Sequence, residues 1–241
     1  MDRGSGTVAA YQAALRSVRF QNLHDNPTTA IRDLALEVHD GGLASATQTL
    51  QVLLTVVNDA PLLTIGTPSV SYTEGDGWLT LDGGIVVFDV DSTTLSSATV
   101  TIGTGFEFGH DELDVAAPGL LSATWDGNTG VFTLSGIGTL GQYQSALRSL
   151  RYRNASDDVS ATLRELTWRV IDGGLWSNAG STLLAVTAVN DVPILMLTQV
   201  LLSYTEGLGY LTLDPSITIH DADDSILEQV VICLLYTSPS P

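Results

Sequence analysis

The sequence repeats itself at a constant interval of about 132 residues, and this repeat limits the possible folds more than any other feature. Four short motifs occur twice with this spacing: Tyr-Thr-Glu-Gly at 72–75 and 204–207, Asn-Asp-x-Pro at 58–61 and 190–193, Tyr-Gln-x-Ala-Leu-Arg-Ser at 11–17 and 143–149, and Asp-Gly-Gly-Leu at 40–43 and 172–175. Because the interval is the same for all four motifs, no net insertion separates the copies, and the chain is a tandem array. A period of this length is typical of an independent domain, since the units of a solenoid have roughly 20–45 residues.

The motif positions predict the division of the chain. Residues 58–189 form one complete repeat, residues 1–57 the C-terminal part of a first repeat, and residues 190–231 the N-terminal part of a third. We therefore expect a fragment of a larger protein. Residues 232–241 match nothing at the expected spacing and resemble translated adapter sequence, so we expect a non-native tail, and its Cys233 is given no chemical role.

Charge and cysteine content exclude several function classes. The chain has 27 acidic residues against 9 basic ones, all arginine, and a net charge of −18. This balance argues against nucleic acid and against an anionic membrane surface as partners, and it is compatible with cations. A single cysteine excludes disulfides within the chain and zinc sites built from cysteine. No apolar run approaches the roughly 18 residues of a membrane span, and we expect no signal peptide at Met1, because no apolar region follows it.

Within the complete repeat, the hydrophobic pattern predicts strands. Residues 98–102 alternate apolar side chains with threonine, and residues 163–171 place Leu166, Trp168 and Val170 on one face. Glycine and aspartate punctuate the chain at intervals suited to a β-sandwich. The spacing of Leu140, Tyr143, Leu147 and Leu150 predicts one short helix. The predicted fold class is therefore all-β, with tandem sandwich repeats of about 132 residues and one short helix in each repeat.

Three familiar motifs lack the context that their chemistry needs. The Gly-x-Gly-x-x-Gly at 136–141 is not followed by a parallel βαβ unit, so we interpret it as a strand end and turn. The Asp-x-Asp sequences at 89–91 and 221–223 lack the glycine and glutamate of an EF-hand loop. The four histidines are scattered, and neither His-Glu-x-x-His nor Gly-x-Ser-x-Gly occurs. We expect that the protein is not an enzyme.

Acidic side chains gather instead at the ends of the repeats. Calcium takes 6–8 oxygen ligands, mostly carboxylate and carbonyl. Short acidic loops at a domain border can supply these oxygens from two neighbouring domains at once. The alternative interpretation is turn chemistry, because aspartate and asparagine are good turn residues and Asp-Gly-Gly suits a hairpin.

The order of the motifs (Tyr-Thr-Glu-Gly, Asp-x-Asp, Asp-Gly-Gly, Val-Asn-Asp-x-Pro) resembles cadherin-like repeats of the Val-Asn-Asp-Ala-Pro type, which occur in tandem in large surface or secreted adhesion proteins. The resemblance covers residues 1–231. It implies seven-stranded, Ig-like or cadherin-like sandwiches that bind Ca²⁺ at each border, which stiffens a rod used for adhesion. It also implies an extracellular or cell-surface location.

The resemblance assigns metal ligands at two borders. At the first, Asn58 and Asp59 would meet Asp89, Asp91 and Asp172. At the second, Glu74, Asn190 and Asp191 would meet Asp221 and Asp223. The family's Asp-Arg-Glu motif is absent and its linker has more acids, so we expect weak calcium affinity, on the order of 10⁻⁴–10⁻³ M.

The expected partners are the neighbouring repeats of the same chain, with other adhesion proteins or glycans beyond them. Two alternatives stay open. One is a spacer that needs no ion. The other is a carbohydrate- or matrix-binding module in which Trp78, Trp125 or Trp176 stacks on a sugar, although aromatic side chains more often cap a core. Trp125 is predicted to lie in a turn. The Asn154-Ala155-Ser156 sequence is a glycosylation acceptor only in a eukaryotic secretory protein.

Overall fold

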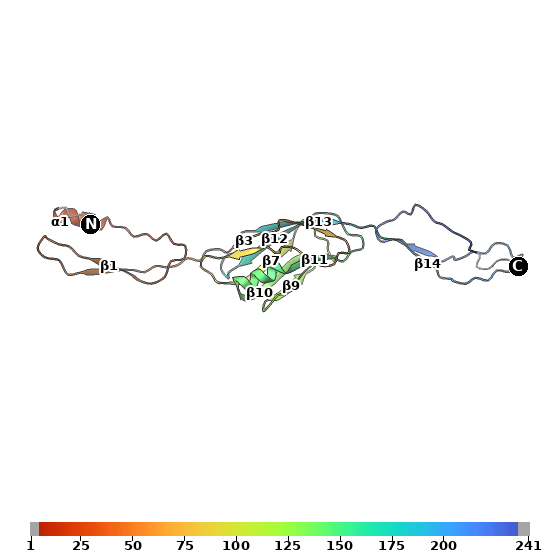
Figure 1. The fold of residues 1–241 in the computed structure, drawn as a ribbon, viewed down its shortest axis with the longest axis horizontal. Helices are drawn as coiled ribbons and strands as arrows, with labels where there is room; N and C mark the ends of the chain where they lie inside the picture. The colour runs from red at the N-terminus through yellow and green to blue at the C-terminus, as the bar shows by residue number, and fades with distance from the viewer. Residues whose placement is uncertain (1–4, 236–241) are drawn as a thin grey trace.

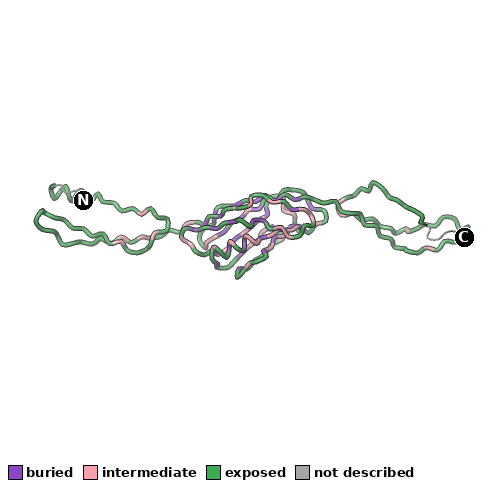
Figure 2. Tube along the Cα trace, in the orientation of Figure 1, coloured by how far each residue is buried: buried purple, intermediate pink, exposed green. Residues whose placement is uncertain are grey.

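The computed structural model describes residues 5–235 and is elongated, with the two ends of this range at opposite ends of the long axis (Figure 1). The central unit, residues 58–189, is broad and layered, whereas the chain on either side of it forms thin, open loops (Figure 1). Buried residues are concentrated in the central unit, and the flanking segments are almost entirely exposed (Figure 2). The hydrophobic core of the molecule therefore lies in the one complete repeat.

The fold is all-β, as predicted, with 35% of the residues in strands and 8% in helices. The strands of the central unit are β3 (Leu62–Thr64), β4 (Ser69–Thr73), β5 (Leu79–Thr80), β6 (Val86–Phe88), β7 (Thr94–Ile102), β8 (Asp111–Val115), β9 (Ser122–Asp126), β10 (Val131–Thr139), β11 (Leu150–Asn154), β12 (Arg164–Ile171) and β13 (Gly180–Thr187). These eleven strands exceed the seven that the family resemblance implied.

Two principal sheets form the layers of the sandwich. The larger has six strands in the order β4-β13-β12-β7-β10-β9, and the smaller has three in the order β5-β11-β8. Strands β4 and β13 pair in parallel, so the first strand of the larger sheet lies beside the last strand of the unit. The other pairings in both sheets are antiparallel. A separate pair, β3 and β6, lies at the end of the unit where the chain enters.

The core contains the inward face of each sheet. Leu166, Trp168 and Val170 of β12 are fully buried at alternate positions, which confirms the face predicted from their spacing. Tyr72 of β4 and Tyr152 of β11 meet edge to face across the two layers, with ring centroids 5.1 Å apart. One continuous cluster of buried side chains thus joins both sheets and the helix.

The predicted helix is α2, Leu140–Arg148, which packs against β6, β7 and β10. Its first turn has a capping box, in which the Thr139 hydroxyl accepts from the Gln142 N–H and the Gln142 side chain accepts from the Thr139 N–H. The glycines before it serve the backbone. Gly136 has a φ of +118° within the irregularity between Ser135 and Gly138, where β10 slips relative to β7. This agrees with the interpretation of the glycine motif as a strand end.

The flanking segments contain displaced copies of the same elements: α1 (Val8–Arg16), β1 (Arg32–Leu36), β2 (Gln48–Val52), β14 (Ile194–Met196) and β15 (Thr218–His220). Each of them lies one repeat length away from all or part of its counterpart in the central unit. The β1–β2 hairpin corresponds to β12–β13, and the β14–β15 pair to β3–β6. Secondary structure therefore recurs with the same period as the motifs.

Neither helix of the described chain has the length or the hydropathy that crossing a membrane requires. Cys233 is exposed, and the last six residues of the tail fall outside the described range.

Candidate metal centres at the junctions

The first junction is the border between residues 5–57 and the central unit. Here the linker residues Asn58 and Asp59 contact two acidic turns. The Asn58 side-chain amide donates to Asp172 Oδ2 at 2.7 Å, and the Asp59 N–H donates to Asp91 Oδ2 at 3.1 Å. The structure thus brings together the residues predicted for this border, with Asp89 two positions before Asp91.

Asp89 has an unusual environment for a carboxylate. It is only 8% exposed, and its Oδ1 accepts from the N–H groups of Asp91 and Ser92 at 3.0 and 2.8 Å. Its Oδ2 is buried and has no hydrogen-bond partner. Burial raises the pKa of Asp89 above its ordinary value, the two N–H groups oppose this rise, and the neighbouring Asp91 adds to it. A bound cation would relieve this unfavourable charge.

Asp172 combines turn chemistry with a contact to the linker. Its Oδ1 accepts from the N–H groups of Gly174 and Leu175 at 2.7 and 2.8 Å, which closes the Asp-Gly-Gly turn. Burial alone would raise the pKa of Asp172, but the hydrogen bonds from Leu175, Asn58 and Gly174 outweigh it and lower the pKa. Its oxygens are already hydrogen-bonded, so Asp172 fits a metal less well than Asp89 does.

The second junction is the border between the central unit and residues 190–235, and it repeats the first. The Asp191 N–H donates to Asp223 Oδ2 at 3.1 Å, the same distance as between Asp59 and Asp91. Glu74 Oε2 accepts from the Val189 N–H at 2.8 Å, beside the linker. The Asn190 amide donates to the Asp191 carbonyl and to no acidic side chain that the structure describes. Its predicted role as a ligand therefore has less geometric support than that of Glu74.

Negative charge accumulates at this second border. Partial desolvation, followed by the charges of Asp223, Glu74 and Asp157, raises the pKa of Asp191. By contrast, the N–H of Asp224 holds the pKa of Asp221 below its usual range. The charge of Asp221 in turn contributes to the raised pKa of Asp191.

Four buried side-chain oxygens in the described part of the chain have no hydrogen-bond partner, and all four belong to predicted ligands: Glu74 Oε1, Asp89 Oδ2, Asp91 Oδ1 and Asp223 Oδ1. Two belong to each junction. An unpaired buried acceptor costs on the order of 1–3 kcal/mol, and more for a charged group, so such atoms are uncommon in proteins and mark places where water or an ion binds. Carboxylate oxygens are the ligands that calcium prefers. The residues present therefore fit a hard divalent cation.

Sequence reasoning missed three groups at these borders. Asp224 joins Asp221 and Asp223 in a cluster whose carboxylate oxygens lie within 4.8 Å of one another. Asp157 is close enough to influence Asp191, and the Asn26 amide donates to the Val90 carbonyl across the first junction at 3.0 Å. Position 224 is a serine in the preceding copy, Ser92, so the repeated motifs gave no reason to select it. Asn26 lies in a loop whose contact with the next unit appears only in three dimensions, and Asp157 lies in the corresponding loop of the following repeat.

The tryptophans do not form an open stacking platform on the smaller sheet. The guanidinium groups of Arg151 and Arg153 each lie 4.5 Å from the centre of the Trp78 ring. The same arginines pair with Asp114 and Glu112 at 2.5 and 2.7 Å. Trp78 is therefore covered by a ladder of paired charges.

The other two candidate tryptophans, Trp125 and Trp176, differ from each other. Trp125 lies in strand β9, not in the predicted turn, and meets Phe106 edge to face against the core. The prediction was wrong because the turn residues begin at Asp126, one position later. Trp176 is 45% exposed and follows the Asp-Gly-Gly turn. Of the three candidates, Trp176 best keeps the exposure that a sugar-binding side chain needs.

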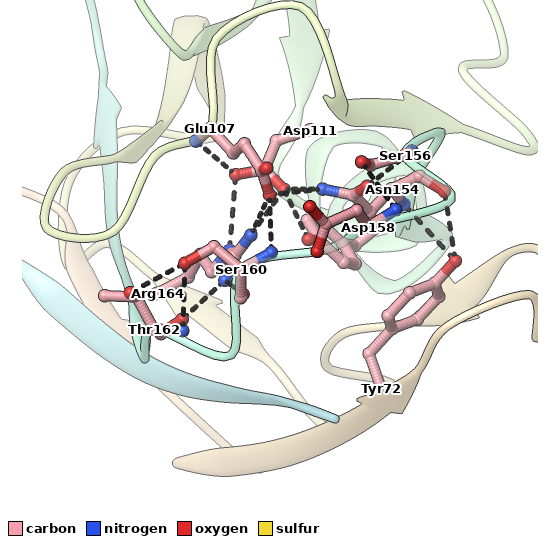
Figure 3. A network of polar contacts seen from close by, with 10 residues as sticks. Tyr72, Glu107, Asp111, Asn154, Ser156, Asp158, Ser160, Thr162 and Arg164 are labelled. Carbon is pink, nitrogen blue, oxygen red and sulfur yellow. Dashed lines mark hydrogen bonds and ion pairs between the residues drawn. The ribbon is translucent and has the colours of Figure 1, made fainter. Parts of the chain in front are cut away.

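Asn154 is a poor glycosylation acceptor in the folded protein. Its side-chain amide donates to Asp111 at 2.8 Å and to Glu107 at 3.1 Å, and its oxygen accepts from the Ser156 N–H at 2.8 Å (Figure 3). The residue is 9% exposed. Modification of this amide would require the network around it to open.

No protein-family model matches this sequence. The chain is 32% identical over 115 residues to Halomucin of Haloquadratum walsbyi, and the aligned stretch spans 46% of this chain and 1% of Halomucin. The similarity is therefore to a small part of a far longer protein. It does not identify cadherin-like repeats.

Proposed function

We propose that this chain is part of a structural repeat array of a surface or secreted protein, with adjacent repeats joined by Ca²⁺ at their borders. The observation behind this proposal is the set of four unpaired, buried carboxylate oxygens, two at each junction. A cation that accepts these oxygens as ligands would compensate for their burial.

Electrostatics supplies the mechanism. Residues 58–189 contain fifteen acidic side chains and five arginines, so successive repeats repel one another. At each border the linker aspartate binds the acidic turn of the following unit only through its backbone N–H. A divalent ion held by both groups would neutralise their charge and limit the angle between the units. The array would then change from a flexible chain to a stiff one.

The similarity to Halomucin supports a surface or extracellular setting, since that protein is named as a mucin. The all-β sandwich and the tandem organisation also support a structural role without catalysis. We propose neighbouring repeats as the first partners of each unit. Adhesion proteins or glycans would be further partners of the assembled rod.

A calcium titration of the whole chain tests the proposal. A ligand that binds only the folded, docked state stabilises it by about 2.7 kcal/mol at one hundred times its dissociation constant. We expect millimolar CaCl₂ to raise the Tm of the central unit and to lengthen the particle in small-angle scattering. The matched control is the Asp89→Asn, Asp91→Asn double variant, in which both responses should be reduced.

An unchanged Tm and an unchanged scattering profile at calcium concentrations roughly ten times the weak extracellular dissociation constants would contradict the calcium proposal. The chain would then be an ion-independent spacer. Equal responses of the wild type and the double variant would place any calcium effect outside the predicted ligands.

A further inference from the structure

The interior of the central unit contains a polar network that ends at the second junction. At its centre is Arg164, whose side chain is fully buried and forms ion pairs with Glu107 at 2.7 Å and with Asp111 at 3.4 Å (Figure 3). A buried guanidinium with two carboxylates costs much desolvation, so such a group is weak evidence for stability alone. The loop carbonyls that Arg164 contacts indicate a role other than stabilising the core.

Arg164 also holds the loop before it. Its Nη1 donates to the carbonyl of Thr162 at 2.5 Å and to the carbonyl of Ser160. Glu107, its ion-pair partner, accepts from the Ser160 N–H at 3.4 Å. The guanidinium and its partner therefore fix the backbone of residues 160–162 from both sides.

The network continues along the loop toward the junction. Asp111 and Glu107 both accept from the Asn154 amide. The Asn154 oxygen accepts from the Ser156 N–H at 2.8 Å, and the Ser156 hydroxyl accepts from the Asp158 N–H at 3.1 Å (Figure 3). Asp157 lies between these two held positions. The start of this loop contacts the strand that leads to Glu74, because the Tyr72 hydroxyl donates to the Asn154 carbonyl at 3.3 Å (Figure 3).

The first segment repeats this arrangement one period earlier in the chain. Arg32 corresponds to Arg164 and donates to the carbonyls of Thr28 and Ala30, which correspond to Ser160 and Thr162. The Asn22 oxygen accepts from the His24 N–H at 2.8 Å, as the Asn154 oxygen does from Ser156. In this copy the loop reaches the next unit directly, because the Asn26 amide donates to the Val90 carbonyl.

We propose that Arg164 and Arg32 are positioning residues, each of which holds the loop through which its repeat meets the following one. The arginine fixes residues 154–162 or 22–30 and so places Asp157, or Asn26, at the border. The predicted effect of these arginines on cation binding rests on the proposed function. Their role in holding the loop does not depend on the proposed function.

Arg164→Lys and Arg32→Lys form a matched pair of tests in the whole chain. Lysine keeps the charge but lacks the planar fork that reaches two carbonyls and two carboxylates. Without calcium, Arg164→Lys should speed the hydrogen exchange of the Ser156, Asp158 and Ser160 amides by about tenfold or more, the effect of losing a hydrogen bond to a charged group. Arg32→Lys should do the same at His24 and leave residues 154–162 unchanged.

With calcium, NMR titration of the Asp191 and Asp223 amides should show weaker binding in Arg164→Lys by about tenfold, with the Asp59 and Asp91 amides as the unaffected reference within the same molecule. If Arg164 only stabilised the core, exchange would rise equally across the β7–β12 ladder and both junctions would weaken together, and this would overturn the proposal.

Arg32→Lys keeps the test decisive if the Arg164 variant does not fold, since Arg32 lies outside the central core. Unchanged exchange at His24 in that variant would overturn the inference. A wild type that does not respond to calcium would overturn the proposed function, and the exchange data alone would then decide the role of the arginines.

Discussion

The central unit and the first segment contain the same helix in two environments. Helices α1 and α2 occupy equivalent positions in successive repeats, and a threonine caps each one. Tyr143 and Leu147 of α2 are 0% and 1% exposed, whereas the corresponding Tyr11 and Leu15 of α1 are 46% and 45% exposed. The comparison teaches that local sequence determines where the helix begins and ends, while burial depends on strands that come from elsewhere in the repeat.

A hollow in the first segment shows how its packing differs from that of the central unit. It has a volume of about 450 Å³ and is lined in part by Phe20, Asn22 and Leu54. Their counterparts in the central unit, Tyr152, Asn154 and Val186, surround Tyr72 of β4. In the central unit these positions therefore pack against Tyr72, whereas in the first segment they line an open hollow.

The largest test of this comparison is the pair Leu147→Ala and Leu15→Ala. Leu147 fills the core under α2, so its truncation should cost about 2–5 kcal/mol through lost burial and the cavity left behind. Leu15→Ala should change the stability of the central unit by less than about 0.5 kcal/mol, as exposed substitutions do. Urea unfolding monitored by tryptophan fluorescence measures both. Equal losses would show that the first segment is packed as tightly as the central unit.

A second pair, Asp89→Asn and Asp221→Asn, compares the buried and the half-buried copy of one acidic turn. In calcium-free buffer at neutral pH, Asp89→Asn should stabilise the central unit by about 1.5 kcal/mol, because the new amide can donate to the carboxylate of Asp91. Asp221→Asn should give no such gain, since the pKa of Asp221 is already lowered by the Asp224 N–H. Thermal unfolding measures this difference, and a loss of stability in Asp89→Asn would contradict it.

The same pair gives a pH dependence. The folded protein raises the pKa of Asp89 above 3.8, so it holds this proton more tightly than the unfolded chain does. The contribution of Asp89 to stability is then complete below pH 3.8 and is lost as the pH rises through the raised pKa. The Tm of the wild type relative to Asp89→Asn should therefore fall over this interval without calcium. A difference that is constant with pH would show that Asp89 is not perturbed.

The smallest expected effect concerns the helix caps. Thr139→Ala removes the capping box of α2 and should cost the central unit about 1 kcal/mol. Thr7→Ala removes the simpler cap of α1, in which Thr7 accepts from the Ala10 N–H, and should raise only the exchange of the α1 amides. Hydrogen exchange with a denaturant series separates global from local loss. A global effect of Thr7→Ala would indicate that the two regions unfold together.

Periodic patterns in the sequence were sufficient to predict the fold class, the helix and the buried face of β12, because these depend on local spacing. They were not sufficient for the strand number, because the seven strands came from the family resemblance and the central unit has eleven. Trp125 was predicted to lie in the turn, but the turn residues begin one position later, at Asp126. At the junctions, the predicted acids do lie together, but Asp157 and Asn26 reach the border through loop geometry set by distant residues such as Arg164. No spacing rule in a single sequence contains that information.

The parallel pairing of β4 and β13 has a mechanical consequence. Because the chain enters the central unit upstream of β4 and leaves it after β13, tension on the two ends pulls these strands lengthwise in opposite directions. Five pairs of residues, from Ser69 with Leu183 to Thr73 with Thr187, would then be sheared together instead of peeled apart one after another. A unit built in this way should resist stretching along its long axis far better than its modest size suggests.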